Sequence, residues 1–458
     1  MVFSSIPFLF YFFTAFFALY YIVPFKLKNY CLLVFSLLFY AWGEPIYIFL
    51  MMFTAGVDWL DGLMLERHPK AKKLYLTIAV VINLGLLCFF KYADFLLGAV
   101  GSIFRIDVPV IGLSLPIGIS FYTFQSMSYS LDVYRGDAKV EHNYFYYLMY
   151  VSMFPPLIAG PRVRYQPVAD EIRVRDISRE DFVKGFSRFL LGLFKKVLLA
   201  NALGELFTLV SAESSVSAVT AWLGLTGFAL QIYFDFSGYS DMAIGMGLMM
   251  GFHFLENFDH PYIASSVTEF WRRWHISLST WFRDYVYIPL GGNRVSVPRH
   301  IFNLMVVWLL TGFWHGAAYN FILWGIYYGI ILILEKYVYG KALAKAPKIV
   351  GHVYTVFAFM MGWVLFAFDD MGQLGRFFVS LFGANGFADP SSLFYFRSYI
   401  IAIIAGVVCS TPLIGNFLKK EHKPITEVII SLITALLFVI TVAALVTDSY
   451  NPFLYFRF

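Results

Sequence analysis

Charged residues are scarce in this sequence. Asp, Glu, Lys and Arg make up 14% of its 458 residues, whereas an ordinary soluble domain has about a quarter. Apolar residues account for 60% and aromatic residues for 20%, and the mean hydropathy is +0.70. This composition excludes a disordered chain, which needs high charge and low hydrophobicity, and it argues against an ordinary water-soluble enzyme.

Cysteines and the common catalytic signatures are also rare or absent. Cys31, Cys88 and Cys409 each lie alone in an apolar run, so we interpret them as packing residues and expect no disulfide scaffold. The sequence has no GxSxG elbow, P-loop, HExxH motif or Rossmann fingerprint. His253 and His260 lie in a polar loop, where we expect no metal ion. The net charge of +5 is small, and no basic stripe carries interleaved aromatics, which gives nucleic-acid binding no support.

Long apolar runs make up most of the chain. Residues 3–23 form a run that no basic residue precedes and no small-residue cleavage site follows, so we expect a retained membrane helix and no signal peptide. About 20 residues span a bilayer, and similar runs recur along the chain. They lie near 30–65, 74–104, 144–160, 186–210, 218–251, 301–334, 350–368, 395–416 and 427–447. The sequence therefore predicts one all-α polytopic membrane domain over residues 1–458, with roughly ten to twelve membrane helices plus interfacial or re-entrant helices.

Basic clusters between these runs predict an orientation. One cluster contains Lys26 and Lys28, a second lies within residues 67–73, and a third contains Lys419, Lys420 and Lys423. Basic loops favour the cytoplasm, and placing all three clusters there puts both termini outside. The alternative is that these side chains snorkel at either membrane face.

Residues 269–285 combine tryptophans with charge. At 100° per residue in one helix, five apolar side chains form a stripe: Trp271, Trp274, Leu278, Trp281 and Tyr285. An adjacent stripe holds four polar candidates for substrate binding or catalysis: Arg272, His275, Ser279 and Arg283. One interpretation is an interfacial anchor with snorkelling arginines. The histidine beside two arginines favours a group that binds and deprotonates a substrate.

Residues 311–320 place a histidine inside the apolar run 301–334. Trp314 and Asn320 accompany His315, and Gly312 and Gly316 let another helix or a ligand approach the backbone. A hydrogen-bonded packing histidine is one interpretation. An ionisable residue inside a membrane is nevertheless a functional candidate, and histidine is the side chain best suited to general-base catalysis near neutral pH.

Two further stretches carry polar or helix-breaking residues. In residues 231–241, Asp235 and Asp241 need partners, which we expect to be the arginines of 269–285, and Gly238 marks a helix break. Structural pairing and direct chemistry are both open for these acids. The two prolines at 155–156, followed by Arg162 and Arg164, predict a re-entrant or cavity-lining stretch.

These stretches together resemble the membrane-bound O-acyltransferases. The family signature is similar to residues 271–294, and its other motifs are similar to 154–162, 233–241 and 311–320, while the ending 451–458 resembles bacterial members. The Gly-Gly-Asn-Arg sequence at 291–294 favours the bacterial polysaccharide O-acetyltransferase branch, which includes the membrane subunits of alginate and peptidoglycan O-acetylation. The resemblance places the family's histidine at His315 and a second functional position at His275.

The resemblance implies a ring of helices around a funnel in a bacterial cytoplasmic membrane. A cytoplasmic thioester, acetyl-CoA or another acyl donor, would be a co-substrate, with no bound cofactor or metal. The acceptor would be an extracytoplasmic polysaccharide or an SGNH-hydrolase-like partner protein that completes O-acetylation. Two alternatives stay open: D-alanyl transfer to teichoic acid, and a transporter with a buried polar path, which would predict inverted repeats that the sequence lacks.

Overall fold

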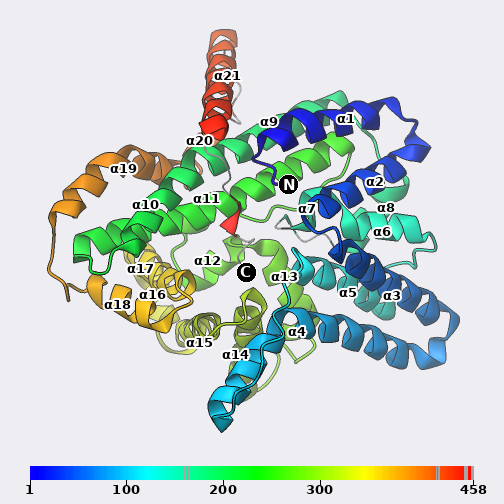
Figure 1. Ribbon diagram of the computed structural model, residues 1–458, viewed down its shortest axis with the longest axis horizontal. Helices are drawn as coiled ribbons and strands as arrows, with labels where there is room; N and C mark the ends of the chain where they lie inside the picture. The colour runs from blue at the N-terminus through cyan, green and yellow to red at the C-terminus, as the bar shows by residue number, and fades with distance from the viewer. Residues whose placement is uncertain (159, 162–163, 419, 421–422, 448–451, 455–458) are drawn as a thin grey trace. The chain divides into compact units, whose positions relative to one another are not determined.

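Helices form all the regular secondary structure of the described residues (Figure 1). The computed structural model describes residues 1–158, 160–161, 164–418, 420, 423–447 and 452–454. The predicted all-α architecture is therefore confirmed. Arg162, Lys419 and most of the C-terminal motif, residues 451 and 455–458, lie outside the described residues.

Six described segments are long and apolar enough to cross a membrane, which agrees with a polytopic membrane protein. Pro7–Ile22 is also apolar but shorter than these segments. The further membrane crossings that the sequence predicts stay a prediction. The six segments are Tyr47–Arg67, Pro69–Phe104, Tyr319–Lys345, Lys348–Ala367, Pro390–Cys409 and Pro424–Thr447.

The chain divides into two compact units that interleave along the sequence. The first unit contains Met1–Leu190 and Tyr239–Leu255. Its helices are η1 (Pro7–Phe12), α1 (Phe13–Ile22), α2 (Phe25–Gly43), α3 (Tyr47–Arg67), η2 (Pro69–Ala71), α4 (Lys72–Phe104), α5 (Ile119–Arg135), α6 (Tyr144–Ser152), α7 (Phe154–Leu157), α8 (Tyr165–Arg173), most of α9 (Arg179–Phe194) and the end of α11 (Ala218–Met250). The break between α6 and α7 falls before the two prolines, as their sequence predicts, because proline cannot continue a helix.

A buried carboxylate connects three helices of the first unit. Asp58 on α3 has no exposed surface, and it accepts hydrogen bonds from the hydroxyls of Ser126 and Ser130 on α5 at 2.6 and 2.7 Å. The Asn83 side chain on α4 donates a third bond at 2.9 Å. A buried polar group is costly unless it is hydrogen-bonded, so this network fixes the packing of α3, α4 and α5. The sequence analysis did not single out Asp58.

The second unit contains Leu191–Gly238 and Glu256–Leu454 and holds both candidate histidines. Its helices are η3 (Lys195–Ala200), α10 (Asn201–Ala212), most of α11, η4 (Pro261–Ile263), α12 (Val267–Arg273), α13 (Ile276–Phe282), η5 (Arg283–Tyr287), α14 (Val297–His315), α15 (Tyr319–Leu334), η6 (Glu335–Tyr339), α16 (Gly340–Lys345), α17 (Lys348–Ala367), α18 (Met371–Leu381), α19 (Pro390–Cys409), α20 (Leu413–Leu418) and α21 (Pro424–Thr447).

The helix break predicted at Gly238 is wrong. Helix α11 continues through this residue without interruption. A β-carbon at Gly238 would lie 2.8 Å from the carbonyl oxygen of Gly192 and 3.3 Å from the amide nitrogen of Lys196. The glycine therefore serves close helix packing in the second unit, where any larger residue would push the neighbouring backbone away.

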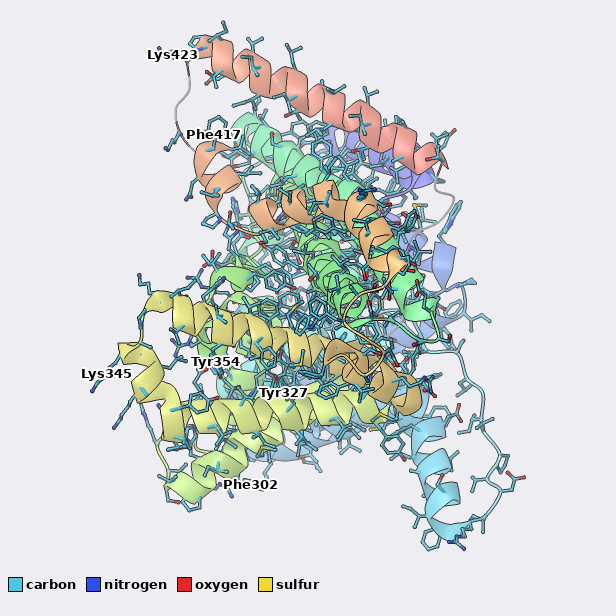
Figure 2. All side chains as sticks on the ribbon, turned by 90° about the vertical axis from the view of Figure 1, so that its left-hand side faces the viewer. Phe302, Tyr327, Lys345, Tyr354, Phe417 and Lys423 are labelled. Atoms are coloured by element: carbon cyan, nitrogen blue, oxygen red, sulfur yellow. The ribbon has the colours of Figure 1, made fainter. Side chains whose placement is uncertain are left out.

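Helices α14 and α15 form a tight hairpin. In Figure 2, α15, which carries Tyr327, lies between α14, which carries Phe302, and α17, which carries Tyr354. The Tyr327 hydroxyl donates to the carbonyl of Ala358 at 2.8 Å, which ties α15 to α17. Glycines let the hairpin close, because a β-carbon at Gly312 would overlap the Phe321 carbonyl. This confirms the prediction that Gly312 lets another helix approach the backbone.

Substitution of Gly325 should destabilise the hairpin. A β-carbon at Gly325 would lie 2.5 Å from the Trp308 carbonyl oxygen, so Gly325→Ala must push α14 and α15 apart. We expect a loss of about 1–3 kcal/mol, the usual cost of overpacking, and a lower melting temperature in detergent. Gly85→Ala on α4 is the matched control, because no atom lies within 4 Å of its new β-carbon. Equal melting temperatures for the two variants would contradict this account.

Candidate active site

His275 lies at a break between two short helices. Helix α12 ends at Arg273, α13 begins at Ile276, and His275 has left-handed backbone angles, φ 44° and ψ 54°. Such angles are uncommon for a residue other than glycine and persist only where the surroundings hold them. The prediction of one continuous helix over 269–285 is therefore wrong at this residue.

Asn257 holds the His275 turn in place. Its side-chain oxygen accepts from the amide and hydroxyl of Ser277 at 3.3 and 2.8 Å, and its backbone carbonyl accepts from the Ile276 amide at 2.9 Å. His275 Nδ1 lies 3.1 Å from the same side-chain oxygen. The Ser277 amide can only donate, which identifies this Asn257 atom as the oxygen, and an amide oxygen only accepts, so Nδ1 carries the hydrogen. Nε2 is then the acceptor nitrogen of the neutral ring.

Three aromatic rings also lie against His275. The side chain is 2% exposed. Phe236 on α11 contacts the imidazole edge-on, with ring centroids 4.6 Å apart, and Phe258 stacks at 6.5 Å. Trp314 on α14 lies 6.2 Å away on the same centroid measure. An imidazole in such a dry site interacts strongly with any polar substrate group that enters it.

His315 is the last residue of α14 and lies in an aromatic cage. It is 5% exposed, and the extended backbone of Gly316 turns the chain into α15. Four rings surround the imidazole: Trp314 at 4.9 Å, Trp324 at 5.1 Å, Phe366 at 5.2 Å and Phe321 at 6.5 Å, measured between centroids. These rings come from α14, α15 and α17, so three helices position this histidine.

The two histidines meet at one tryptophan. Trp314 is 3% exposed, and its ring contacts both His315 and His275. The sequence analysis selected His275 in one stretch and the pair Trp314–His315 in another, and the structure brings the two stretches together within the second unit. Two buried imidazoles near one ring can supply a proton acceptor and a second group that orients a substrate.

The other polar candidates of 269–285 do not join this cluster. Arg272, Ser279 and Arg283 are all exposed, whereas His275 is buried. Arg283 forms an ion pair with the adjacent Asp284 at 2.7 Å. The expected shared stripe is wrong because the left-handed turn at His275 interrupts the helical periodicity and directs its ring inward.

Asp235 and Asp241 have basic partners other than the expected ones. Asp235 forms an ion pair with Lys196 at 2.5 Å in the second unit. Asp241 pairs with Arg188 at 2.7 Å in the first unit. The expectation that the arginines of 269–285 supply these partners is therefore wrong, since α11 presents both acids to the segment around α9 and η3.

Asn320 lies at the start of α15 and is completely buried. Its amide nitrogen donates to Asp369 at 3.3 Å, which connects the α14–α15 turn to the end of α17. This contact stabilises the turn that carries His315. Among the described residues, no group of three or more His, Cys, Asp or Glu side chains could hold a metal ion.

Two acidic residues fix α12, the helix that leads into His275. Glu335 is 6% exposed, and its carboxylate accepts from the amides of Val267 and Thr268 at 2.8 and 2.9 Å, where a helix N-terminus favours negative charge. Although partial burial opposes the shift, hydrogen bonds from Ser265 and Arg273 lower the pKa of Glu269. Glu269 therefore stays charged and anchors both ends of α12.

Sequence reasoning missed Asn257 and Glu335. Asn257 precedes His275 by 18 residues in an irregular segment, and no motif or spacing marks it. Glu335 is an acid at the end of an apolar run, which the scarcity of charge in this chain would have made a candidate. Neither spacing nor periodicity indicates which amides or side chain they contact.

Comparisons with known proteins identify the family of this chain. The sequence matches the membrane-bound O-acyltransferase family over residues 4–369. It is 38% identical to the probable alginate O-acetylase AlgI of Azotobacter vinelandii over the whole of both chains. It is 34% identical to the peptidoglycan O-acetyltransferase of Helicobacter pylori, over 77% of this chain and 73% of that one. It is 29% identical to the teichoic acid D-alanyltransferase of Bacillus subtilis, over 47% of this chain and 58% of that one. The chain is thus a multi-pass membrane protein and an O-acyltransferase, and it belongs to the membrane-bound O-acyltransferase family.

Proposed function

We propose that this protein transfers an acetyl group from a cytoplasmic thioester to a hydroxyl outside the bacterial cytoplasmic membrane. The hydroxyl belongs to a cell-surface polysaccharide or to an SGNH-type partner protein that completes the O-acetylation. The convergence of His275 and His315 on Trp314 carries this proposal, because it places two imidazoles in one dry aromatic site. The names of the alginate and peptidoglycan relatives support a polysaccharide acceptor.

His315 is the proposed general base. A thioester is already activated, so the enzyme mainly needs to make the acceptor hydroxyl nucleophilic. His315 takes the hydroxyl proton as the oxygen attacks the thioester carbonyl, and the thiolate leaves as the tetrahedral intermediate collapses. General-base catalysis of this kind contributes roughly 10²–10⁴-fold. The cage of rings around His315 excludes water and fixes the ring orientation.

His275 is the proposed orienting group. With Nδ1 donating to Asn257, the neutral ring presents Nε2 as an acceptor. Nε2 suits a hydrogen bond from a donor group of the acceptor substrate beside the reacting hydroxyl, which leaves the proton of that hydroxyl to His315. Donation to an oxyanion, the other role expected from the sequence, would need a protonated ring. Arg272 is exposed and does not support this role. Both substrates meet in one site, so we propose direct transfer, which isolation of an acyl-enzyme after donor alone would overturn.

The runner-up function is D-alanyl transfer to teichoic acid. The B. subtilis relative carries that name, but it aligns with less of this chain than the alginate relative does. Membership of an acyltransferase family argues against the transporter. We propose that the thioester is acetyl-CoA, that no metal or bound cofactor takes part, and that residues 1–458 act as one membrane domain with both termini outside.

A vesicle assay tests this function. The protein is reconstituted with radiolabelled acetyl-CoA on one side, and with the acceptor polysaccharide and the purified SGNH protein from the same genome on the other. We expect base-labile acetyl esters to form only when the donor is on the face of the basic loops at Lys26 and 67–73, which also tests the orientation. A matched assay supplies D-alanyl carrier protein. Transfer of D-alanine without acetyl transfer would reject the proposed function in favour of the runner-up.

A further inference from the structure

A buried ion pair lies close to the candidate site in the second unit. Lys196 Nζ and Asp235 Oδ1 are 2.5 Å apart, and both side chains are 2% exposed. Removing two charges from water costs more than their attraction returns unless further hydrogen bonds satisfy both groups. The partners of this pair therefore indicate what it is for.

A wide helical turn brings Lys196 to this position. Lys196 belongs to η3, a single π-helical segment between α9 and α10. Such segments shift side chains relative to the flanking α-helix and are frequent at functional sites. The missing side chain of Gly238 lets the α11 backbone approach the Lys196 amide closely. The π-helical turn of η3 and the close approach at Gly238 together bring the Lys196 side chain to Asp235.

The C-terminal segment supplies further partners. The Leu454 amide donates to Asp235 Oδ2 at 2.7 Å, so both oxygens of this carboxylate are engaged. Lys196 Nζ donates to the Pro452 carbonyl at 3.2 Å and lies 4.7 Å from the centre of the Phe453 ring. Phe453 is 1% exposed and Leu454 is 9% exposed. The ion pair thus holds residues 452–454, which we name the C-terminal clamp, although the clamp is 219 residues from Asp235 along the chain.

The same part of α11 supports His275. Phe236 follows Asp235 directly and contacts the His275 ring edge-on at 4.6 Å. Tyr233 lies about one helical turn before Phe236 on α11. Its ring contacts that of Trp274, the residue before His275, with centroids 6.2 Å apart. The rotation of α11 that lets Asp235 receive the clamp is therefore the rotation that puts Phe236 against the imidazole. A change in this rotation moves Phe236 away from His275.

We propose that the C-terminal clamp is a positioning element of the acyl-transfer site, with Lys196 and Asp235 as its anchoring residues. The clamp fixes the rotation of α11, and α11 in turn fixes the His275 ring. This inference rests on the proposed function. The clamp takes no part in bond making, so its loss should lower turnover without changing how the thioester binds. A misplacement of about 1 Å at a catalytic group costs about 10²-fold in rate.

The test removes one hydrogen-bond donor. Leu454→Pro deletes the amide that donates to Asp235 and leaves residues 455–458 in the chain, whereas Leu454→Ala keeps the amide and is the matched control. In the vesicle assay we expect Leu454→Pro to lower kcat about 10–100-fold with the KM for acetyl-CoA unchanged, and Leu454→Ala to behave as wild type. A general loss of folded protein would also lower the apparent kcat without changing KM. Turnover is therefore expressed per amount of folded protein, measured by size-exclusion chromatography in detergent, for Leu454→Pro and Leu454→Ala alike.

A second variant covers the case in which Leu454→Pro does not fold. Replacing both partners, Lys196→Met with Asp235→Leu, leaves no unpaired charge and removes both anchors of the clamp. We expect the same fall in kcat and faster hydrogen exchange at the clamp amides than in wild type. Wild-type kcat in either folded variant would overturn the positioning role of the clamp and leave the proposed function standing. A wild-type protein that transfers no acetyl group overturns both.

Discussion

Replacing His315 with alanine should lower acetyl transfer about 10²–10⁴-fold, the contribution of a general base, at normal protein abundance. The physical reason is that the thioester supplies the leaving group but nothing in it accepts the proton of the attacking hydroxyl. His315 is 5% exposed, and the rings of its cage have no basic atom that could take over the role. The measurement is cell-surface O-acetyl content together with kcat in vesicles.

The control for this substitution is His253→Ala. His253 lies in the first unit, where its exposed ring pairs with Glu171 at 2.8 Å, and we expect this variant to keep wild-type activity. A second variant, His315→Gln, fills more of the cage than alanine does but has no basic nitrogen. It should be as inactive as His315→Ala. Undiminished acetylation in His315→Ala would overturn the assignment of the base, while equal losses in the His253 control would point to a folding defect.

Replacing His275 with alanine should lower kcat about 10²-fold, which is the loss that follows when a reacting hydroxyl is no longer held in line with its base. Asn257→Leu should reproduce a large part of this loss without touching the imidazole. It removes the acceptor for Nδ1 and for both Ser277 donors, so the tautomer and the left-handed turn lose their support.

Kinetics of the two variants distinguish orientation from folding. We expect His275→Ala to keep the KM for the thioester, because the proposed contact is with the acceptor substrate, and to lose kcat. Asn257→Ser, whose hydroxyl oxygen can still accept a hydrogen bond from the turn, should recover part of the Asn257→Leu loss. A kcat for His275→Ala within about twofold of wild type would reject an orienting role, since it corresponds to less than about 0.5 kcal/mol.

Residue types and their local setting allowed much of the site to be predicted. His315 stands among small residues in an apolar run, and a buried ionisable group in a membrane protein needs a purpose. His275 was selected for the wrong geometric reason, because periodicity assumes an unbroken helix and the turn at 274–275 has no glycine or proline to mark it. The partners of Asp235 and Asp241 were assigned wrongly, since a charge shows that a partner is needed and does not say which one.

The sequence by itself determined the environment and the helical architecture of this protein, and it singled out the two candidate histidines. Scarce charge and long apolar runs leave a membrane as the solvent, and a lipid-spanning backbone must then be helical. Only the tertiary structure decided that Trp314 joins His275 to His315, that Asn257 sets the imidazole, and that the C-terminal clamp meets Lys196 and Asp235. These contacts join residues up to 256 positions apart, and composition and periodicity carry information only about neighbours within a few helical turns.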